Sequence, residues 1–206
     1  MVSFFKKLNK KSYMKKIMFS FAVIAASISL FSFVPKAINA DVVTFNVTAQ
    51  KSKVDFTGSK KSDYHTGYFP IKSGAVQVNG GKLVGGSFVI DIAGLKVTDA
   101  GGGEKLQGHL SSGDFFDIAK VGFGEASFTI TSIEYTKADR ATIKGDLNLK
   151  GIKAPVTFSA VIRNADDKGF FAEAFMPFDR TLFGINYGIG MVDSEVQLAI
   201  HIYGTK

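Results

Sequence analysis

The chain of 206 residues contains no cysteine. This absence excludes disulfide bonds, thiolate metal sites, a cysteine nucleophile and an acylated lipoprotein cysteine. Two familiar catalytic loops are missing as well. The glycines at 101–103 are not followed by the lysine and hydroxyl pair of a phosphate-binding loop, and no Gly-x-Ser-x-Gly elbow occurs. A domain without disulfides must be stabilised by its hydrophobic core.

Acidic residues are absent from residues 1–40, which hold seven of the 25 lysines and arginines. Residues 41–206 therefore carry 18 bases and 18 acids, and the net charge of +7 belongs to the N-terminal segment. A formally neutral domain is not expected to bind nucleic acid through its net charge.

The N-terminal segment has the pattern of an export signal. Lysines up to Lys16 precede an uncharged apolar run at 17–34, and the small residue Ala40 suits a cleavage site. The run is also close to the shortest length that spans a bilayer. We expect residues 1–40 to be a signal peptide or an N-terminal membrane anchor. Residues 41–206 would then form one exported domain, periplasmic or secreted, with membrane association through this segment.

Alternation of apolar and polar residues dominates residues 41–206. Ala126, Phe128 and Ile130, for example, are separated by serine and threonine. A period of two places alternate side chains on opposite faces of a strand, and many such strands without a long helix predict an all-β sandwich or closed barrel. One segment, 104–111, has the pattern of a short helix or loop, expected at a barrel mouth. The expected strands are 42–47, 53–57, 67–71, 74–78, 83–92, 95–97, 126–135, 141–149, 156–162, 170–177 and 195–203.

Four segments together resemble the YceI-like polyisoprenoid-binding family. They are LVGGSFVID at 83–91 with Thr98 and Asp99 after it, KLQGHLSSGDFFD at 105–117, IKGDLNLKGIKAPVTF at 143–158, and FDRTLFGI at 178–185. Their order and spacing also fit, so the resemblance extends over roughly residues 43–203.

The resemblance implies an exported bacterial protein with an extended antiparallel lipocalin-like β-barrel of about eight strands. It further implies an apolar interior that holds the tail of a polyisoprenoid or isoprenoid quinone, with no covalent cofactor. The expected partners are this lipid and, in a homodimer, a second copy of the chain.

Apolar burial alone can supply the affinity that such a barrel needs. An eight-stranded barrel has room for one ligand. At about 0.3 kcal/mol per heavy atom, a tail of about 40 carbons gives about 12 kcal/mol, close to a nanomolar dissociation constant. The alternative is that most large aromatic residues are ordinary core. The candidate lining residues are Phe88, Phe115, Phe116, Phe123, Phe128, Phe158, Phe175, Phe183 and Tyr187.

Few polar residues offer chemistry, and the candidates lie in the family-like segments: His109, Asp114, Asp117 and Arg180. We expect a structural polar cluster, in which Arg180 pairs with Asp114 or Asp117 and fixes the loop onto the barrel. Alternatively, Arg180 faces a ligand headgroup. Further alternatives are a metal site that adds His65 and a hydrolase or isomerase that uses His109 with Asp114.

The sequence thus predicts a non-enzymatic, exported lipid-binding protein that transports or stores its ligand. The alternative function is that of an envelope stress-response or interaction protein, whose barrel is filled by its own side chains and has no lipid cargo.

Overall fold

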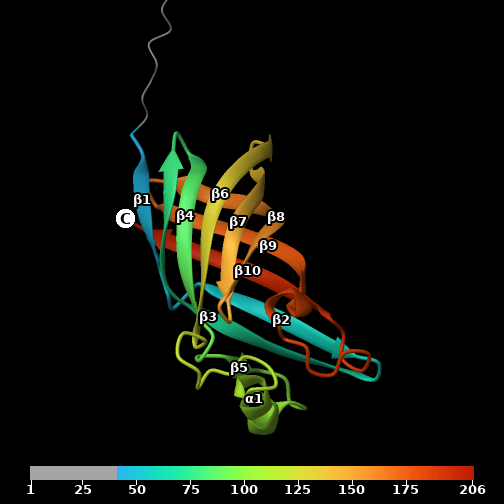
Figure 1. Ribbon diagram of the computed structural model, residues 1–206. Helices are drawn as coiled ribbons and strands as arrows, with labels where there is room; N and C mark the ends of the chain where they lie inside the picture. The colour runs from blue at the N-terminus through green and yellow to red at the C-terminus, as the bar shows by residue number, and fades with distance from the viewer. Residues whose placement is uncertain (1–40) are drawn as a thin grey trace, which may run out of the picture. The chain divides into compact units, whose positions relative to one another are not determined.

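The computed structural model describes residues 41–206, which are mostly β-strand (Figure 1). The predicted signal peptide or anchor at residues 1–40 lies outside the described residues. The strands are β1 (Val43–Val47), β2 (Lys53–Lys60), β3 (Asp63–Asn79), β4 (Lys82–Asp91), β5 (Lys96–Val97), β6 (Glu125–Lys137), β7 (Arg140–Leu149), β8 (Ile152–Asp166), β9 (Gly169–Asp179) and β10 (Glu195–Thr205). The helices are α1 (Gly103–Ser111) and the single 3-10 turn η1 (Arg180–Phe183).

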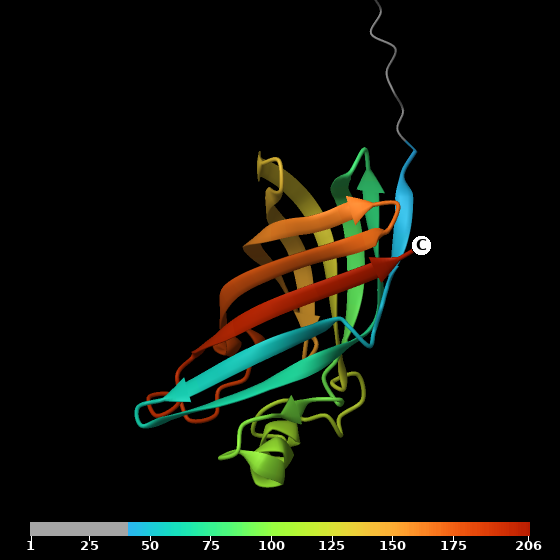
Figure 2. The same cartoon turned by 180° about the vertical axis from the view of Figure 1, so that it is seen from behind.

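Eight of these strands close into an antiparallel barrel, which confirms the predicted fold class. The ring runs β10-β2-β3-β4-β6-β7-β8-β9 and returns to β10. β1 pairs with both β10 and β3, while β5 pairs with β3 outside the ring. Two views of the ribbon from opposite sides show strands enclosing the interior from both directions (Figures 1 and 2).

The two ends of the barrel differ. The end that we call the mouth end carries the β2–β3 hairpin, α1, the β7–β8 turn and η1. The opposite, closed end carries β1 and the β3–β4, β6–β7 and β8–β9 turns. There Phe45, Val78 and Phe170 are buried, and the ring centroids of Phe45 and Phe170 lie 6.4 Å apart. Any opening into the interior is therefore expected at the mouth end.

Two elements of the structure can be compared directly with the helix and strands predicted from the sequence. The predicted helix at 104–111 is confirmed as α1, which begins one residue earlier. The prediction of two separate strands at 67–71 and 74–78 is wrong, because β3 is continuous across both ranges. A register shift between Ile71 and Ser73, where β3 pairs with β4, produces the break that looked like a turn. No helix within residues 41–206 is long and apolar enough to cross a bilayer.

Candidate functional site

A cavity of about 470 Å³ lies inside the barrel. All eight strands of the ring contribute to its lining, and most of the lining side chains are apolar. Its volume falls in the range of about 300–1,000 Å³ that is usual for small-molecule pockets. The interior of this barrel is therefore not filled completely by its own side chains.

Strand alternation explains which residues reach the cavity. On β6, Ala126, Phe128 and Ile130 line it, whereas the serine and threonine between them point outward. On β10, the residues that line the cavity are Val196, Leu198, Ile200 and Ile202. Alternation in the sequence indicated that these aliphatic residues share one face, although only aromatic residues were predicted to line the cavity.

Six of the nine aromatic residues predicted to line the cavity do so: Phe88, Phe115, Phe116, Phe128, Phe158 and Tyr187. Phe128 is central to one wall, with its ring centroid 6.3 Å from that of Phe88 and 5.8 Å from that of Phe158. Gly145 makes room for this ring, because a Cβ there would lie 2.3 Å from Phe128 Cζ. The wall is therefore shaped by a glycine as well as by aromatic residues.

The remaining three predicted aromatics lie elsewhere, and each for a definite reason. Phe175 follows Ala174 on β9, so it points to the outer surface and is 66% exposed. Phe183 is buried behind the wall and stacks on Phe178, with centroids 5.2 Å apart. Phe123 lies in the loop before β6 beneath the Lys120 ammonium, which is 4.3 Å from its ring centroid. The hydrophobicity of these three residues did not indicate whether each lies on the cavity, on the outer surface, behind the wall or in a loop.

His109 brings the helix to the rim of the cavity. Its Nε2 lies 3.1 Å from Asp114 Oδ2, and its ring meets the edges of Phe115 and Tyr187 at centroid distances of 5.2 and 4.6 Å. His109, Leu106 and Leu110 of α1 all line the cavity. The predicted closeness of His109 and Asp114 is therefore present, at the mouth and beside apolar rings.

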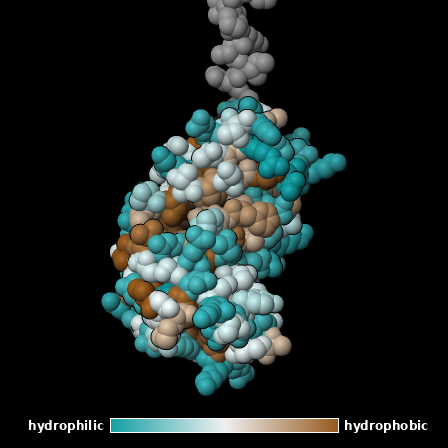
Figure 3. Space-filling model, turned by 90° about the vertical axis from the view of Figure 1, so that its right-hand side faces the viewer, coloured by the Kyte–Doolittle hydropathy of each residue, from teal (hydrophilic) through white to brown (hydrophobic). Residues whose placement is uncertain are grey.

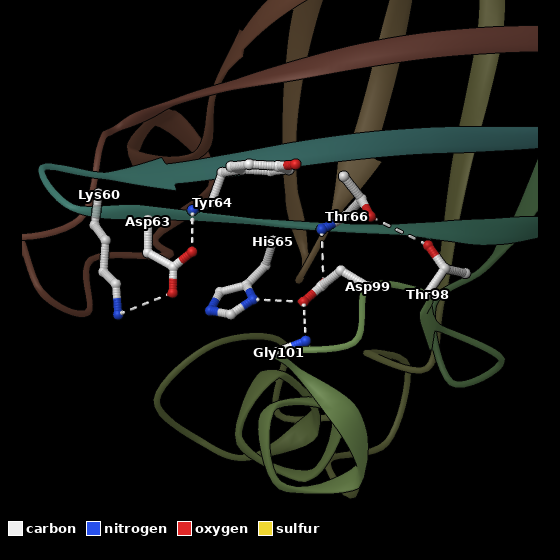
Figure 4. Close-up of polar contacts among 8 residues, drawn as sticks. All are labelled: Lys60, Asp63, Tyr64, His65, Thr66, Thr98, Asp99 and Gly101. Carbon is white, nitrogen blue, oxygen red and sulfur yellow. Dashed lines mark hydrogen bonds and ion pairs between the residues drawn. The ribbon is translucent and has the colours of Figure 1, made fainter.

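A second histidine–carboxylate pair, which the sequence reading did not name as a site, also lies at the mouth (Figure 4). His65 Nδ1 is 3.1 Å from Asp99 Oδ1, and the backbone amides of Thr66 and Gly101 donate to the Asp99 carboxylate at 2.9 and 3.0 Å. The hydrogen bond from His65, followed by that from the Thr66 amide, lowers the pKa of Asp99 to about 2. The carboxylate fixes the segment before α1 to β3. In the sequence, the only indication of this contact was the Thr98-Asp99 pair in one of the family-like segments.

The prediction that Arg180 pairs with Asp114 or Asp117 is wrong. The buried guanidinium donates instead to three backbone carbonyls in the loop before β10, those of Ile185, Val192 and Asp193. Its Cζ also lies 5.9 Å from the ring centroid of Phe115. The carbonyls satisfy the guanidinium without a carboxylate, so Arg180 fixes its own loop.

The loop after α1 is held by a different cation. The Lys150 ammonium, on the β7–β8 turn, donates to the carbonyl of Phe115, and burial lowers the pKa of Lys150. Asp117, whose φ is 52°, donates its backbone amide to the Ser112 carbonyl at 2.8 Å. The structural polar cluster is therefore divided into separate groups.

Metal binding by His65, His109 and Asp114 was a further alternative. Each histidine instead has a carboxylate neighbour of its own, Asp99 for His65 and Asp114 for His109. Within residues 41–206, no group of three or more metal-ligating side chains is placed to hold an ion.

Known proteins with a similar sequence cover most of the chain. A YceI-like domain model matches residues 45–203. A UPF0312 protein of Vibrio vulnificus is 28% identical over 90% of this chain and 98% of its own length. A UPF0312 protein of Pseudomonas putida is 34% identical, but that match covers 48% of this chain and only 52% of the relative.

Solved structures show the same barrel. BcnA of Burkholderia cenocepacia superposes with a TM-score of 0.66 at 21% identity, over 77% of this chain and 99% of its own. A polyisoprenoid-binding domain from Saccharophagus degradans, implicated in plant cell wall breakdown, gives a TM-score of 0.60 at 12% identity, over 80% of this chain and 99% of its own. At these identities the likeness concerns the fold. The match of the family model over 45–203, on a closed barrel with an apolar cavity, shows that this chain belongs to the YceI-like domain family.

Proposed function

We propose that this protein binds the hydrocarbon tail of an isoprenoid-type lipid or quinone in its barrel and transports or stores it without covalent chemistry. The observation that carries the proposal is the cavity of about 470 Å³, lined by apolar side chains from every strand of the ring. Family membership supports it, as does the polyisoprenoid-binding description of one structural neighbour.

The physical argument favours an apolar ligand with a small polar end. Burial of each methylene contributes roughly 0.8 kcal/mol, so affinity does not require many polar contacts. Apart from Glu173 on β9, the titratable side chains on the lining lie at the mouth end, among them Lys60, His65 and His109. A tail in the interior would therefore place its headgroup beside these residues.

We also propose that the protein works outside the cytoplasm, because residues 1–40 have the charge and hydropathy pattern of an export signal. Cargo and location can be tested in one experiment. The protein is isolated from the periplasmic and secreted fractions of its native host, extracted with organic solvent and analysed by mass spectrometry. The same fractions from a strain that lacks the gene supply the background.

A polyprenyl species enriched with the exported protein is the expected result. Repeatedly empty extracts would contradict the lipid-carrier function and favour the interaction protein. Recovery of the protein only from the cytoplasm would contradict export. Solvent extraction and mass spectrometry of the cytoplasmic protein would still test ligand binding.

A further inference from the structure

Exposed apolar side chains gather at one corner of the mouth end. They lie on the β2–β3 hairpin and on the loop before β10, and we call them the mouth tip: Tyr64, Tyr187, Ile189 and Met191. Ile189 is 60% exposed and Met191 is 72% exposed. Single exposed hydrophobic residues are common in soluble proteins, whereas a group at one site indicates a binding surface.

The two segments of the mouth tip are joined by backbone contacts. The Asp193 amide donates to the Ser59 carbonyl at 2.9 Å, Lys60 forms a β-bridge with Val192, and Ser59 pairs with Tyr64 across the hairpin. Both ribbon views show this loop beside the hairpin (Figures 1 and 2). The space-filling view from that side shows hydrophobic side chains among polar ones on the lower part of the face (Figure 3).

The mouth tip is continuous with the cavity. Tyr187 is exposed on one side and lines the cavity on the other, and Lys60, Val192 and Asp193 belong to the lining as well. Arg180 holds this loop through the carbonyls of Ile185, Val192 and Asp193. The apolar side chains are therefore presented from a braced loop at the entrance.

The chemistry of the mouth tip fits a lipid bilayer. Aliphatic side chains flanked by tyrosines match the boundary between acyl chains and headgroups, where tyrosine is enriched. Lys60 at the end of β2 and Lys61 in the turn after it can extend their ammonium groups to the headgroups while their stems stay apolar. With 18 bases and 18 acids in residues 41–206, adsorption would depend on apolar insertion rather than on anionic lipid.

A protein partner fits these observations less well. A stable protein interface buries about 800 Å² on each side, whereas the mouth tip consists of a few side chains on two projecting turns. The proposed cargo also resides in membranes, and exposing its tail to water costs roughly 0.8 kcal/mol per methylene. If the entrance contacts the bilayer, the tail can pass between the membrane and the cavity without being exposed to water.

We propose that the mouth tip inserts into the surface of a lipid bilayer and sets the cavity entrance against it, so that the ligand passes directly between membrane and barrel. The account of ligand passage rests on the proposed function, whereas insertion itself can be measured without any ligand.

The chain has no tryptophan, so a single introduced tryptophan reports its surroundings without background. Met191→Trp places the reporter on the mouth tip, and Phe175→Trp places it on the exposed outer wall of β9 as the matched control. Each variant is made as residues 41–206, which leaves out the predicted signal or anchor segment, and is mixed with phosphatidylcholine vesicles. We expect a blue shift of the Met191→Trp emission and its quenching by brominated phosphatidylcholine, with neither effect for Phe175→Trp. An unchanged Met191→Trp spectrum, or equal changes in both variants, would overturn the inference.

A second variant separates docking from ligand binding. Ile189→Ser combined with Met191→Ser leaves the cavity lining intact. We expect vesicle binding and the rate of transfer of a fluorescent prenyl probe from vesicles to fall about tenfold or more. Binding of the same probe from detergent should be unchanged. Transfer at the wild-type rate would contradict the docking role. If the wild type binds no probe at all while Met191→Trp still inserts, the lipid-carrier function fails and membrane docking stands.

Discussion

Arg180 shows how one buried charge can be satisfied by backbone alone. Its side chain is 4% exposed, and its guanidinium donates to three carbonyls of the loop that carries the mouth tip. The bond to the Ile185 carbonyl is buried and the other two are partly buried, so loss of the guanidinium leaves at least the Ile185 carbonyl with poor access to water.

We predict that Arg180→Ala lowers the free energy of unfolding by about 2–3 kcal/mol, because the buried Ile185 carbonyl loses its donor and an orphaned buried polar group costs about 1–3 kcal/mol. Urea denaturation of a protein made of residues 41–206 measures this change. The matched control is Arg163→Ala on the outer face, where the guanidinium pairs with Glu173 and is half exposed. That change should cost no more than about 1 kcal/mol. Equal losses in the two variants would refute the role assigned to Arg180.

At the scale of elements, α1 is a short helix held by a few contacts, among them the hydrogen bond from the Val97 amide to Gln107 Oε1 at 3.2 Å. It has no fully buried residue and no side-chain hydrogen bond at its N-cap. The segment just before it is fixed to β3 through Asp99, which receives hydrogen bonds from His65 and from the Thr66 amide. The segment that leads into α1 is therefore fixed to the barrel through an ionised carboxylate.

This contact predicts a loss of stability in acid. The pKa of Asp99 in the folded protein is about 2, below its ordinary value of 3.8, so the folded state binds its proton less readily than the unfolded chain does. The stabilisation is complete above the unfolded pKa and disappears as the pH falls through the folded value. Between about pH 4 and pH 2, the wild type should lose stability more steeply than Asp99→Asn, as measured by urea unfolding at each pH.

Asp167→Asn provides the control, because Asp167 lies in the β8–β9 turn at the closed end, away from α1. Its pH profile should follow that of the wild type. Parallel profiles for wild type and Asp99→Asn would show that the His65–Asp99 contact does not hold the α1 segment.

At the scale of the whole molecule, the cavity depends on small side chains as much as on large ones. Ala126, Ala160, Ala172 and Ala174 line it from adjoining parts of the ring. A large side chain at any of these positions would occupy the space in which the proposed ligand lies.

We predict that Ala174→Phe reduces the amount of co-purifying lipid at least about tenfold, because the new ring competes with the tail for the same volume. Ala199→Phe is the matched control: Ala199 pairs with Phe175 on the neighbouring strand and shares its outward direction. Solvent extraction and mass spectrometry of both variants give the comparison, with circular dichroism to confirm folding. Lipid retained equally by the two proteins would place the ligand outside the barrel.

The sequence by itself determined the class of fold and the inward face of its strands. Alternation on β6, β8 and β10 predicted which side chains share a face, because successive residues of any strand point in opposite directions. The helix at α1 and the family were also predicted from local segments. The same rule, applied along β9, would have excluded Phe175, since its neighbour Ala174 faces inward.

Only the tertiary structure decided how the mouth is assembled. His65 and Asp99 are 34 residues apart, and Lys150 reaches a carbonyl 35 residues before it. Ring closure itself pairs β10 with β2, bringing Leu198 opposite Phe56. A strand pattern fixes the direction of each side chain, but it does not say which strands become neighbours or where their connecting loops meet. The partners of Arg180, the exposed mouth tip and the size of the cavity all follow from that long-range pairing.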